Sequence, residues 1–215
     1  MNNLKNFKNI IFDFDGTIAD SLPIHENAFA EVLGSYSLIF NYHNYSGMST
    51  ANAFKLIFEE NNIKIDEADL SKLVTIKQQM ANLHYQTSIE FIPGAGEIIR
   101  QLAEQGKFLF VASSGSRFNV ETGLKKLDVF SYFKGVVTSN DVRFGKPDPE
   151  IFLKVIKDFK LNKNETLIIE DANSGLTAAL RAGVEVVCID EKIILQQVNK
   201  NVPIISYSGL LNHFK

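Results

Sequence analysis

Five short apolar runs, separated by segments with helical spacing, constrain the fold more than any other feature of the sequence. The runs span residues 9–12, 107–111, 135–138, 166–169 and 186–189. Their length and their content of β-branched and aromatic residues predict buried strands. Segments 97–105, 149–159 and 174–182 have the apolar spacing of helices. Strands that alternate with helices predict an α/β fold with a doubly wound, mostly parallel sheet.

One long segment lacks this alternation. Residues 21–89 contain only one ambiguous strand candidate, at 37–42. Side chains there recur instead at helical spacing. They are Phe54, Ile57 and Phe58, followed by Leu70, Leu73, Val74, Lys77 and Met80. We therefore predict a helical cap domain over 21–89, inserted into a core domain formed by 1–20 and 90–215.

Composition excludes several classes of protein. An apolar fraction of 45% and a charged fraction of 22% are ordinary for a soluble globular protein. No apolar run approaches the ~20 residues of a membrane helix, and the N-terminus lacks the pattern of a signal peptide. The single cysteine, Cys188, lies in an apolar run, which indicates a buried side chain in a reducing compartment. A net charge of −3 provides no basic surface for nucleic acid. We expect a cytoplasmic monomer or weak dimer with no membrane or nucleic-acid partner.

Two carboxylates, Asp13 and Asp15, follow the first predicted strand directly and precede Gly16 and Thr17. Charged groups at the end of a buried strand are costly unless a cation or a reaction needs them. In open α/β sheets, this edge is where ligands bind. A calcium loop shares the Asp-x-Asp-Gly pattern, but it needs flanking helices and a late Glu, and the sequence provides neither.

Three further polar clusters follow later strands. Ser113 and Ser114 begin a segment whose hydroxyls and amides suit an anion, although a serine there could simply cap a helix. Lys146 lies in a turn framed by glycine and proline, and a solvated lysine is the alternative. Glu170 and Asp171 repeat the pair of acids at a strand end, and helix capping by Asp171 is the alternative.

The joint placement of these clusters is more informative than any one of them. In a doubly wound sheet the ends of these strands converge on one crevice. Four acids gathered there repel one another unless a divalent cation binds between them, and oxygen ligands favour Mg²⁺. With a lysine, hydroxyls and amides added, the set predicts a site for transfer of a phosphoryl group.

This ordered set of motifs resembles the haloacid dehalogenase-like (HAD) superfamily over nearly the whole chain. The motifs are Asp13-Phe14-Asp15-Gly16-Thr17, Ser113, Lys146 and Glu170-Asp171. The helical insert is similar to the small α-helical cap of the branch that contains β-phosphoglucomutases and phosphoglycolate phosphatases. Dehalogenase chemistry is disfavoured, because relatives with that activity usually lack the second aspartate, here Asp15.

The resemblance implies roles for the acids. Asp13 would be the nucleophile that forms an aspartyl-phosphate. Asp15 would protonate the leaving alcohol and then deprotonate the hydrolytic water. Mg²⁺ would be held by Asp13, the backbone carbonyl of Asp15 and Asp171, with Glu170 a direct or a water-mediated ligand.

The resemblance also implies how the phosphoryl group would be bound. Gly16, the Ser113 hydroxyl and the Ser114 amide would contact it, and Lys146 would bridge it to Asp13. Arg117 could reach the substrate or merely begin a helix.

Cap residues would select the substrate. His25 is similar in position to a substrate-side histidine of relatives, so we expect it to contact the leaving group or couple cap closure to Asp15; a surface histidine is the alternative. Segment 45–50 resembles the specificity loop of the branch. Segment 41–45 is either a specificity element or an ordinary loop.

True β-phosphoglucomutases carry a lysine and an arginine in the specificity loop, where this chain has Ser46 and Thr50, and residues 21–89 contain no arginine. Two missing charged hydrogen bonds, at about 1.5–3 kcal/mol each, would weaken binding of a second phosphate. We therefore predict a Mg²⁺-dependent phosphatase that acts on small phosphorylated metabolites such as sugar phosphates. A phosphomutase, a pyrophosphatase and a catalytically silent binding module are the alternatives.

Overall fold

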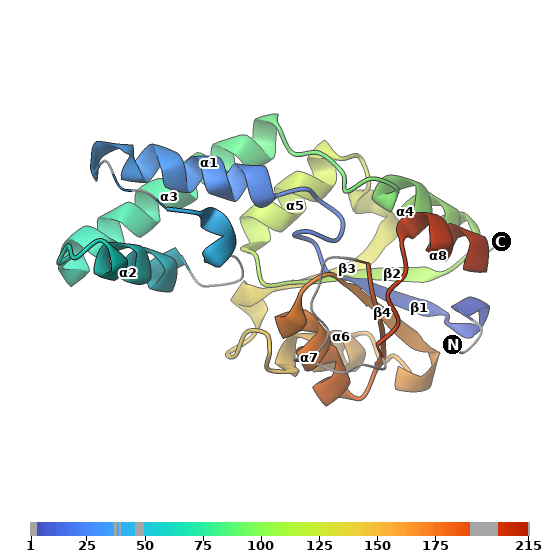
Figure 1. Ribbon diagram of the computed structural model, residues 1–215. Helices are drawn as coiled ribbons and strands as arrows, with labels where there is room; N and C mark the ends of the chain where they lie inside the picture. Colours follow the sequence, from blue (N-terminus) through green and yellow to red (C-terminus); the bar gives the residue numbers. More distant parts are fainter. Residues whose placement is uncertain (1–3, 37, 39, 46–49, 190–201, 215) are drawn as a thin grey trace. The chain divides into compact units, whose positions relative to one another are not determined.

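Among the residues that the structure describes, the core is a parallel sheet of five strands. The computed structural model describes residues 4–36, 38, 40–45, 50–189 and 202–214. The strands are β1 (Asn9–Phe12), β2 (Phe108–Ser113), β3 (Phe133–Thr138), β4 (Thr166–Glu170) and β5 (Glu185–Cys188). Their order is β3-β2-β1-β4-β5, and every neighbouring pair is parallel (Figure 1). The predicted α/β class with a doubly wound parallel sheet is confirmed.

Helices cover both faces of this sheet. One face carries α6 (Glu150–Asp158) and α7 (Asn173–Ala182), and the other carries α4 (Ala95–Glu104), α5 (Arg117–Lys126) and α8 (Tyr207–Phe214) (Figure 1). Short 3₁₀ turns complete the unit: η1 (Leu4–Asn6), η4 (Phe130–Tyr132), η5 (Ser139–Asp141) and η6 (Lys163–Glu165). Because both faces are covered, the middle of each strand is mostly apolar, as in parallel sheets generally. Cys188 is fully buried in β5, as its surroundings in the sequence predicted.

Two strands, β2 and β4, end slightly later than their apolar runs. β2 continues through Ala112 to Ser113, because Ser113 still pairs with Thr138 of β3. β4 likewise continues to Glu170, which pairs with Cys188. Pairing with neighbouring strands therefore carries polar residues into the sheet, where the pattern of apolar residues alone would have ended it.

The inserted segment forms a second compact unit. Contacts divide the chain into one unit of Met1–Asp20 with Ile89–Lys215 and another of Ser21–Ser88. The second contains α1 (Leu22–Leu33), η2 (Gly34–Tyr36), η3 (Tyr42–Asn44), α2 (Thr50–Glu60) and α3 (Glu67–Thr87). No strand occurs among its described residues. Its core includes Phe29, Phe54, Ile57, Phe58, Leu70 and Leu73.

Segment 41–45 contributes two tyrosines to the core of this helical unit. Tyr42 and Tyr45 are buried, and the Tyr45 hydroxyl donates to Glu60 Oε2 at 2.5 Å. This hydrogen bond, with burial, raises the pKa of Tyr45 to about 12. The two tyrosines therefore contribute to the packing of the unit itself. In the part of the chain that the structure describes, no helix has the length and apolar character needed to cross a membrane.

Candidate active site

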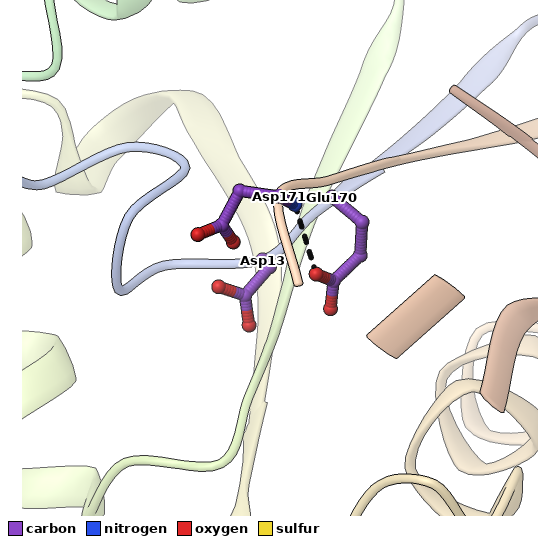
Figure 2. Close-up of side chains that lie close together, drawn as sticks. All are labelled: Asp13, Glu170 and Asp171. Atoms are coloured by element: carbon purple, nitrogen blue, oxygen red, sulfur yellow. Dashed lines mark hydrogen bonds between the residues drawn. The ribbon is translucent and has the colours of Figure 1, made fainter. Parts of the chain in front are cut away.

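Three acids lie together where β1 and β4 end. Asp13 follows β1, and its N–H donates to the Ile169 carbonyl of β4 at 3.0 Å. Glu170 ends β4 and Asp171 follows it. One carboxylate oxygen of each acid lies within 4.8 Å of the others, and Figure 2 shows the three side chains gathered at this edge. The parallel pairing of β1 with β4 brings the two acidic motifs together, although 157 residues separate Asp13 from Glu170.

Lys146 joins two of these acids. Its Nζ donates to Asp13 Oδ1 at 2.5 Å, to Glu170 Oε1 at 2.6 Å and to the Ala112 carbonyl at 3.0 Å. The lysine side chain is only 4% exposed. Burial alone would lower the pKa of Lys146, but the charges of Asp13 and Glu170 raise it above its ordinary value. The lysine is therefore a buried ammonium with three acceptors.

Burial and mutual repulsion act strongly on the acids. Burial, followed by the charges of Glu170 and Asp15, raises the pKa of Asp13 to about 7, although Lys146 opposes the shift. Burial and the charges of Glu170 and Asp13 also raise the pKa of Asp171 well above its ordinary value. A single ammonium does not balance this group of carboxylates. Oxygen donors in a buried, electronegative setting fit a hard divalent cation such as Mg²⁺.

The backbone of the first motif approaches Asp171 closely. Thr17 Oγ1 donates to Asp171 Oδ1 at 3.0 Å. Gly16 has a φ of 82°, and a Cβ there would lie 2.1 Å from Asp171 Oδ2. Only glycine satisfies both the left-handed conformation and this close approach. The family resemblance predicts that Gly16 contacts the phosphoryl group, and in the structure Gly16 packs closely on the Asp171 carboxylate.

Both oxygens of Glu170 are engaged by the protein. Oε1 accepts from Lys146, and Oε2 accepts the backbone N–H groups of Asp171 at 3.0 Å and Ala172 at 3.1 Å. The side chain is 1% exposed. Glu170 thus holds Lys146 and the segment that carries Asp171. The N-cap of α7 is Ala172, so the alternative in which Asp171 caps this helix is wrong.

Asp15 lies beside the serine-rich turn after β2. Ser113 Oγ is 3.5 Å from Asp15 Oδ2 and accepts the Gly115 N–H at 2.9 Å. Ser113 is buried and Ser114 is exposed. The helix cap in this turn is Ser116, whose side chain accepts the Asn119 N–H, so Ser113 does not serve as a cap. The structure therefore places Ser113 between the Asp15 carboxylate and the turn that leads to α5.

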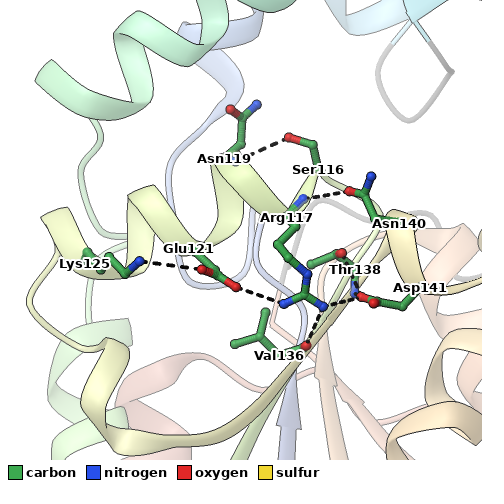
Figure 3. Close-up of polar contacts among 9 residues, drawn as sticks. All are labelled: Ser116, Arg117, Asn119, Glu121, Lys125, Val136, Thr138, Asn140 and Asp141. Carbon is green, nitrogen blue, oxygen red and sulfur yellow. Dashed lines mark hydrogen bonds and ion pairs between the residues drawn. The ribbon is translucent and has the colours of Figure 1, made fainter.

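The guanidinium of Arg117 is engaged away from the acidic group. It donates to Glu121 Oε1 at 2.9 Å, to Asp141 Oδ2 at 2.6 Å and to the Val136 carbonyl at 3.3 Å (Figure 3). Arg117 is the first residue of α5. Of the two roles that the sequence left open, beginning the helix is the one that the structure favours. The expectation that Arg117 binds substrate receives no support from its contacts.

His25 belongs to the helical unit. Its Nδ1 lies 2.9 Å from Lys77 Nζ, and its Nε2 lies 3.3 Å from the Tyr85 hydroxyl. Lys77 is 3% exposed and also lies over the Phe29 ring. The sequence placed Lys77 in an apolar stripe and attached no chemistry to it. Residues 46–49, which include Ser46 of the expected specificity loop, lie outside the described residues, and Thr50 begins α2.

Two long-range contacts near the site could not be predicted from the sequence. Thr17 stands in the first motif, but only the fold shows that its hydroxyl contacts Asp171. Tyr207 lies in α8, and its hydroxyl donates to the Thr17 carbonyl at 2.7 Å. The contact spans 190 residues, so no local pattern could indicate it.

Comparisons with known proteins show which family and fold this chain shares. The family described as haloacid dehalogenase-like hydrolase matches residues 10–189. Fructose-1-phosphate phosphatase YqaB of Escherichia coli is 28% identical over 184 residues, which cover 84% of this chain and 95% of that protein. Pyrophosphatase PpaX of Bacillus mycoides is 25% identical over 189 residues, covering 84% of this chain and 82% of that protein.

A solved structure has the same fold. It is described as a predicted phosphoglycolate phosphatase from Haemophilus somnus, and it is 20% identical to this chain. The TM-score is 0.87, and the match covers 98% of this chain and 99% of the other.

Proposed function

The chain belongs to the haloacid dehalogenase-like hydrolase family, and on this premise we propose that it is a Mg²⁺-dependent phosphatase of small phosphate monoesters. The observation that carries the proposal is the buried group in which Lys146 contacts Asp13 and Glu170 beside Asp171. Buried charges of this density are costly for stability alone. Stabilising a phosphoryl group as it is transferred is a reason to retain them.

Asp13 is the proposed nucleophile. A bond forms between its carboxylate oxygen and phosphorus while the bond from phosphorus to the ester oxygen breaks. Lys146, which holds Asp13 Oδ1, fixes the direction of this carboxylate and offsets the negative charge that gathers around phosphorus. Water then attacks the phosphorus of the aspartyl-phosphate, which releases phosphate and restores Asp13.

Asp15 is the proposed acid and base. It gives a proton to the leaving ester oxygen in the first step and takes one from the attacking water in the second. Its position beside Ser113 supports this role, because Ser113 is expected to bind the transferring phosphoryl group together with the Ser114 amide. Asp13 and Asp15 thus divide nucleophilic and proton-transfer work between them.

Asp13, Asp171 and the Asp15 carbonyl would hold Mg²⁺, with Glu170 a direct or a water-mediated ligand that also supports Asp171 and Lys146. When bound, the ion would neutralise phosphoryl oxygens and make phosphorus more electrophilic. The oxygen-only donor set and the raised pKa of both Asp13 and Asp171 support this assignment.

Sugar phosphates are the proposed substrates. The similarity to a protein named fructose-1-phosphate phosphatase supports this class, and the similarity to one named pyrophosphatase makes pyrophosphate the second candidate. We also propose that Ser21–Ser88 is a cap domain that restricts the enzyme to small substrates.

Phosphate release from a panel of phosphorylated metabolites and pyrophosphate tests the proposal. We expect Mg²⁺-dependent release that EDTA abolishes and that Asp13→Asn removes. Asp20→Asn is the matched control, because Asp20 is an exposed acid just beyond the same loop. No release from any compound would refute the phosphatase, and conversion of glucose 1-phosphate in the presence of a sugar bisphosphate would then indicate a mutase.

A further inference from the structure

The last helix of the chain is docked on the core domain by apolar packing and polar contacts. α8 buries Tyr207, Leu210, Leu211 and Phe214 and contacts α4 (Figure 1). Gln101 Nε2 donates to the Leu211 carbonyl at 3.4 Å, and Gln105 Nε2 donates to the Phe214 carbonyl at 2.7 Å. The carboxyl-terminal end of α8 is therefore attached to α4.

The amino-terminal end of α8 reaches the first motif instead. Tyr207 is 5% exposed, and its hydroxyl donates to the buried Thr17 carbonyl at 2.7 Å. Gly94, with a φ of 90°, allows the backbone before α4 to pack on this residue, because a Cβ there would lie 2.7 Å from Tyr207 Cβ. Tyr207 thus packs on Gly94 with its Cβ, while its hydroxyl contacts the loop after β1 that carries Thr17.

Thr17 connects this hydroxyl to the acidic group. Its carbonyl accepts from Tyr207, and its own hydroxyl donates to Asp171 Oδ1 at 3.0 Å. Thr17 is fully buried, and the neighbouring Gly16 already touches Asp171. A shift of the Thr17 backbone must therefore move the hydroxyl that orients the Asp171 carboxylate.

We infer that Tyr207 is a positioning residue for the reaction, acting through Thr17 on Asp171. The inference rests on the proposed function, in which Asp171 binds Mg²⁺. The Tyr207 hydroxyl sets the place of the Thr17 backbone, Thr17 orients Asp171, and Asp171 faces Asp13 across the cation site. Without the hydroxyl, a buried carbonyl loses its partner, and the loop moves to satisfy it.

Tyr207→Phe tests this, because it removes one oxygen and keeps the ring that packs on Gly94. The matched control is Gln105→Ala, which loosens α8 at its other end and leaves the hydroxyl in place. Two quantities are measured in each variant: amide hydrogen exchange of residues 13–20 without metal, and the Mg²⁺ concentration for half-maximal phosphatase activity. Thermal unfolding reports how far each variant loosens the fold.

For Tyr207→Phe we expect exchange at residues 17–19 and the half-activating Mg²⁺ concentration each to rise about three- to tenfold. We expect Gln105→Ala to lower the unfolding temperature and leave both quantities at their wild-type values. Wild-type behaviour of Tyr207→Phe, or equal changes in Gln105→Ala, would overturn the inference. A wild-type protein without phosphatase activity would refute the proposed function instead, and the exchange measurement would still decide whether the hydroxyl holds the loop.

Discussion

Two regions of the core domain each pair a basic side chain with carboxylates, but one region is buried and the other is partly exposed to solvent. The Lys146 cluster comprises Lys146, Asp13 and Glu170, whose side chains are 4%, 9% and 1% exposed. The Arg117 cluster comprises Arg117, Glu121 and Asp141, whose side chains are 41%, 28% and 24% exposed (Figure 3). Both lie near the ends of strands, and in both one cation pairs with two acids; Glu121 also pairs with Lys125 at 3.6 Å.

Surroundings decide what each cluster can do. In the Arg117 cluster, partial exposure lets water screen the charges, so the contacts are weak and serve to join α5 to the end of β3. In the Lys146 cluster, burial removes water from the charged groups and makes ionised carboxylates costly. The pKa of Asp13, raised by burial to about 7, reflects this cost. The difference teaches that a charged motif at a strand end indicates chemistry when the fold buries it.

The largest expected effect is that of Lys146→Met. It leaves Asp13 and Glu170 buried without their cation, so we expect the free energy of unfolding at neutral pH to fall by about 3–5 kcal/mol and the phosphatase activity to be lost. Urea unfolding in EDTA measures the first and phosphate release the second.

Lys8→Met is the control, because Lys8 pairs with Glu165 at 2.8 Å but is 64% exposed. Its expected cost is about 0.2–1 kcal/mol. If Lys146→Met and Lys8→Met lowered the free energy of unfolding equally, buried and exposed ion pairs would not differ in the way described.

Gly16→Ala tests how tightly the buried region is packed. The new Cβ would meet Asp171 Oδ2, and the φ of 82° is strained for alanine. We therefore expect the free energy of unfolding to fall by about 1–3 kcal/mol and the Mg²⁺-dependent activity to be lost. Gly34→Ala is the matched control, since φ there is −56° and no atom lies within 4 Å of the added Cβ. Activity of Gly16→Ala at the wild-type level would contradict the close approach to Asp171.

Arg117→Met should have a smaller effect. We expect a loss of about 1 kcal/mol or less that shrinks further as salt is added, with an unchanged requirement for Mg²⁺. A double-mutant cycle with Asp141→Asn measures the coupling of the pair. A large loss of substrate affinity would revive the interpretation that Arg117 binds substrate.

The smallest expected effect is the pH dependence of the Arg117 cluster. Burial alone would raise the pKa of Asp141, but hydrogen bonds from Thr138 and the Arg117 guanidinium hold it below its ordinary value of 3.8. Because the folded pKa is the lower one, Asp141 contributes stability above that ordinary value and loses it as pH falls through the folded pKa. The stability difference between wild type and Asp141→Asn should therefore shrink on acidification. A difference that stays constant from neutral to strongly acid pH would contradict this.

Much of the fold could be predicted from local patterns. All five strands coincide with the predicted apolar runs to within two residues at either end, and Gly183 ends α7 in the left-handed conformation, as its place in the sequence indicated. These features depend on neighbours in the chain, so periodicity and turn residues reveal them.

Long-range partners could not be predicted in the same way. The apolar stripe of α3 includes Lys77, but periodicity says nothing of the histidine that it meets, 52 residues earlier. Arg117 could have bound substrate or begun a helix, because two of its acceptors, Asp141 and the Val136 carbonyl, reach it only when β3 and α5 pack. Glu121, its third acceptor, lies one turn further along the same helix. The role of such a side chain depends on hydrogen-bond partners that are distant in the sequence and meet it only in the folded protein.

The sequence by itself determined the class of fold and the identity of the acids and the lysine at the strand ends, because both follow from residue types at short spacing. Tertiary structure alone decided which charges are buried and which are screened. It also decided that Thr17 is held between Asp171 and Tyr207, residues that lie 154 and 190 positions further along the chain. The physical reason is that desolvation and long-range hydrogen bonds depend on distances in space, and the parallel sheet and its covering helices set those distances.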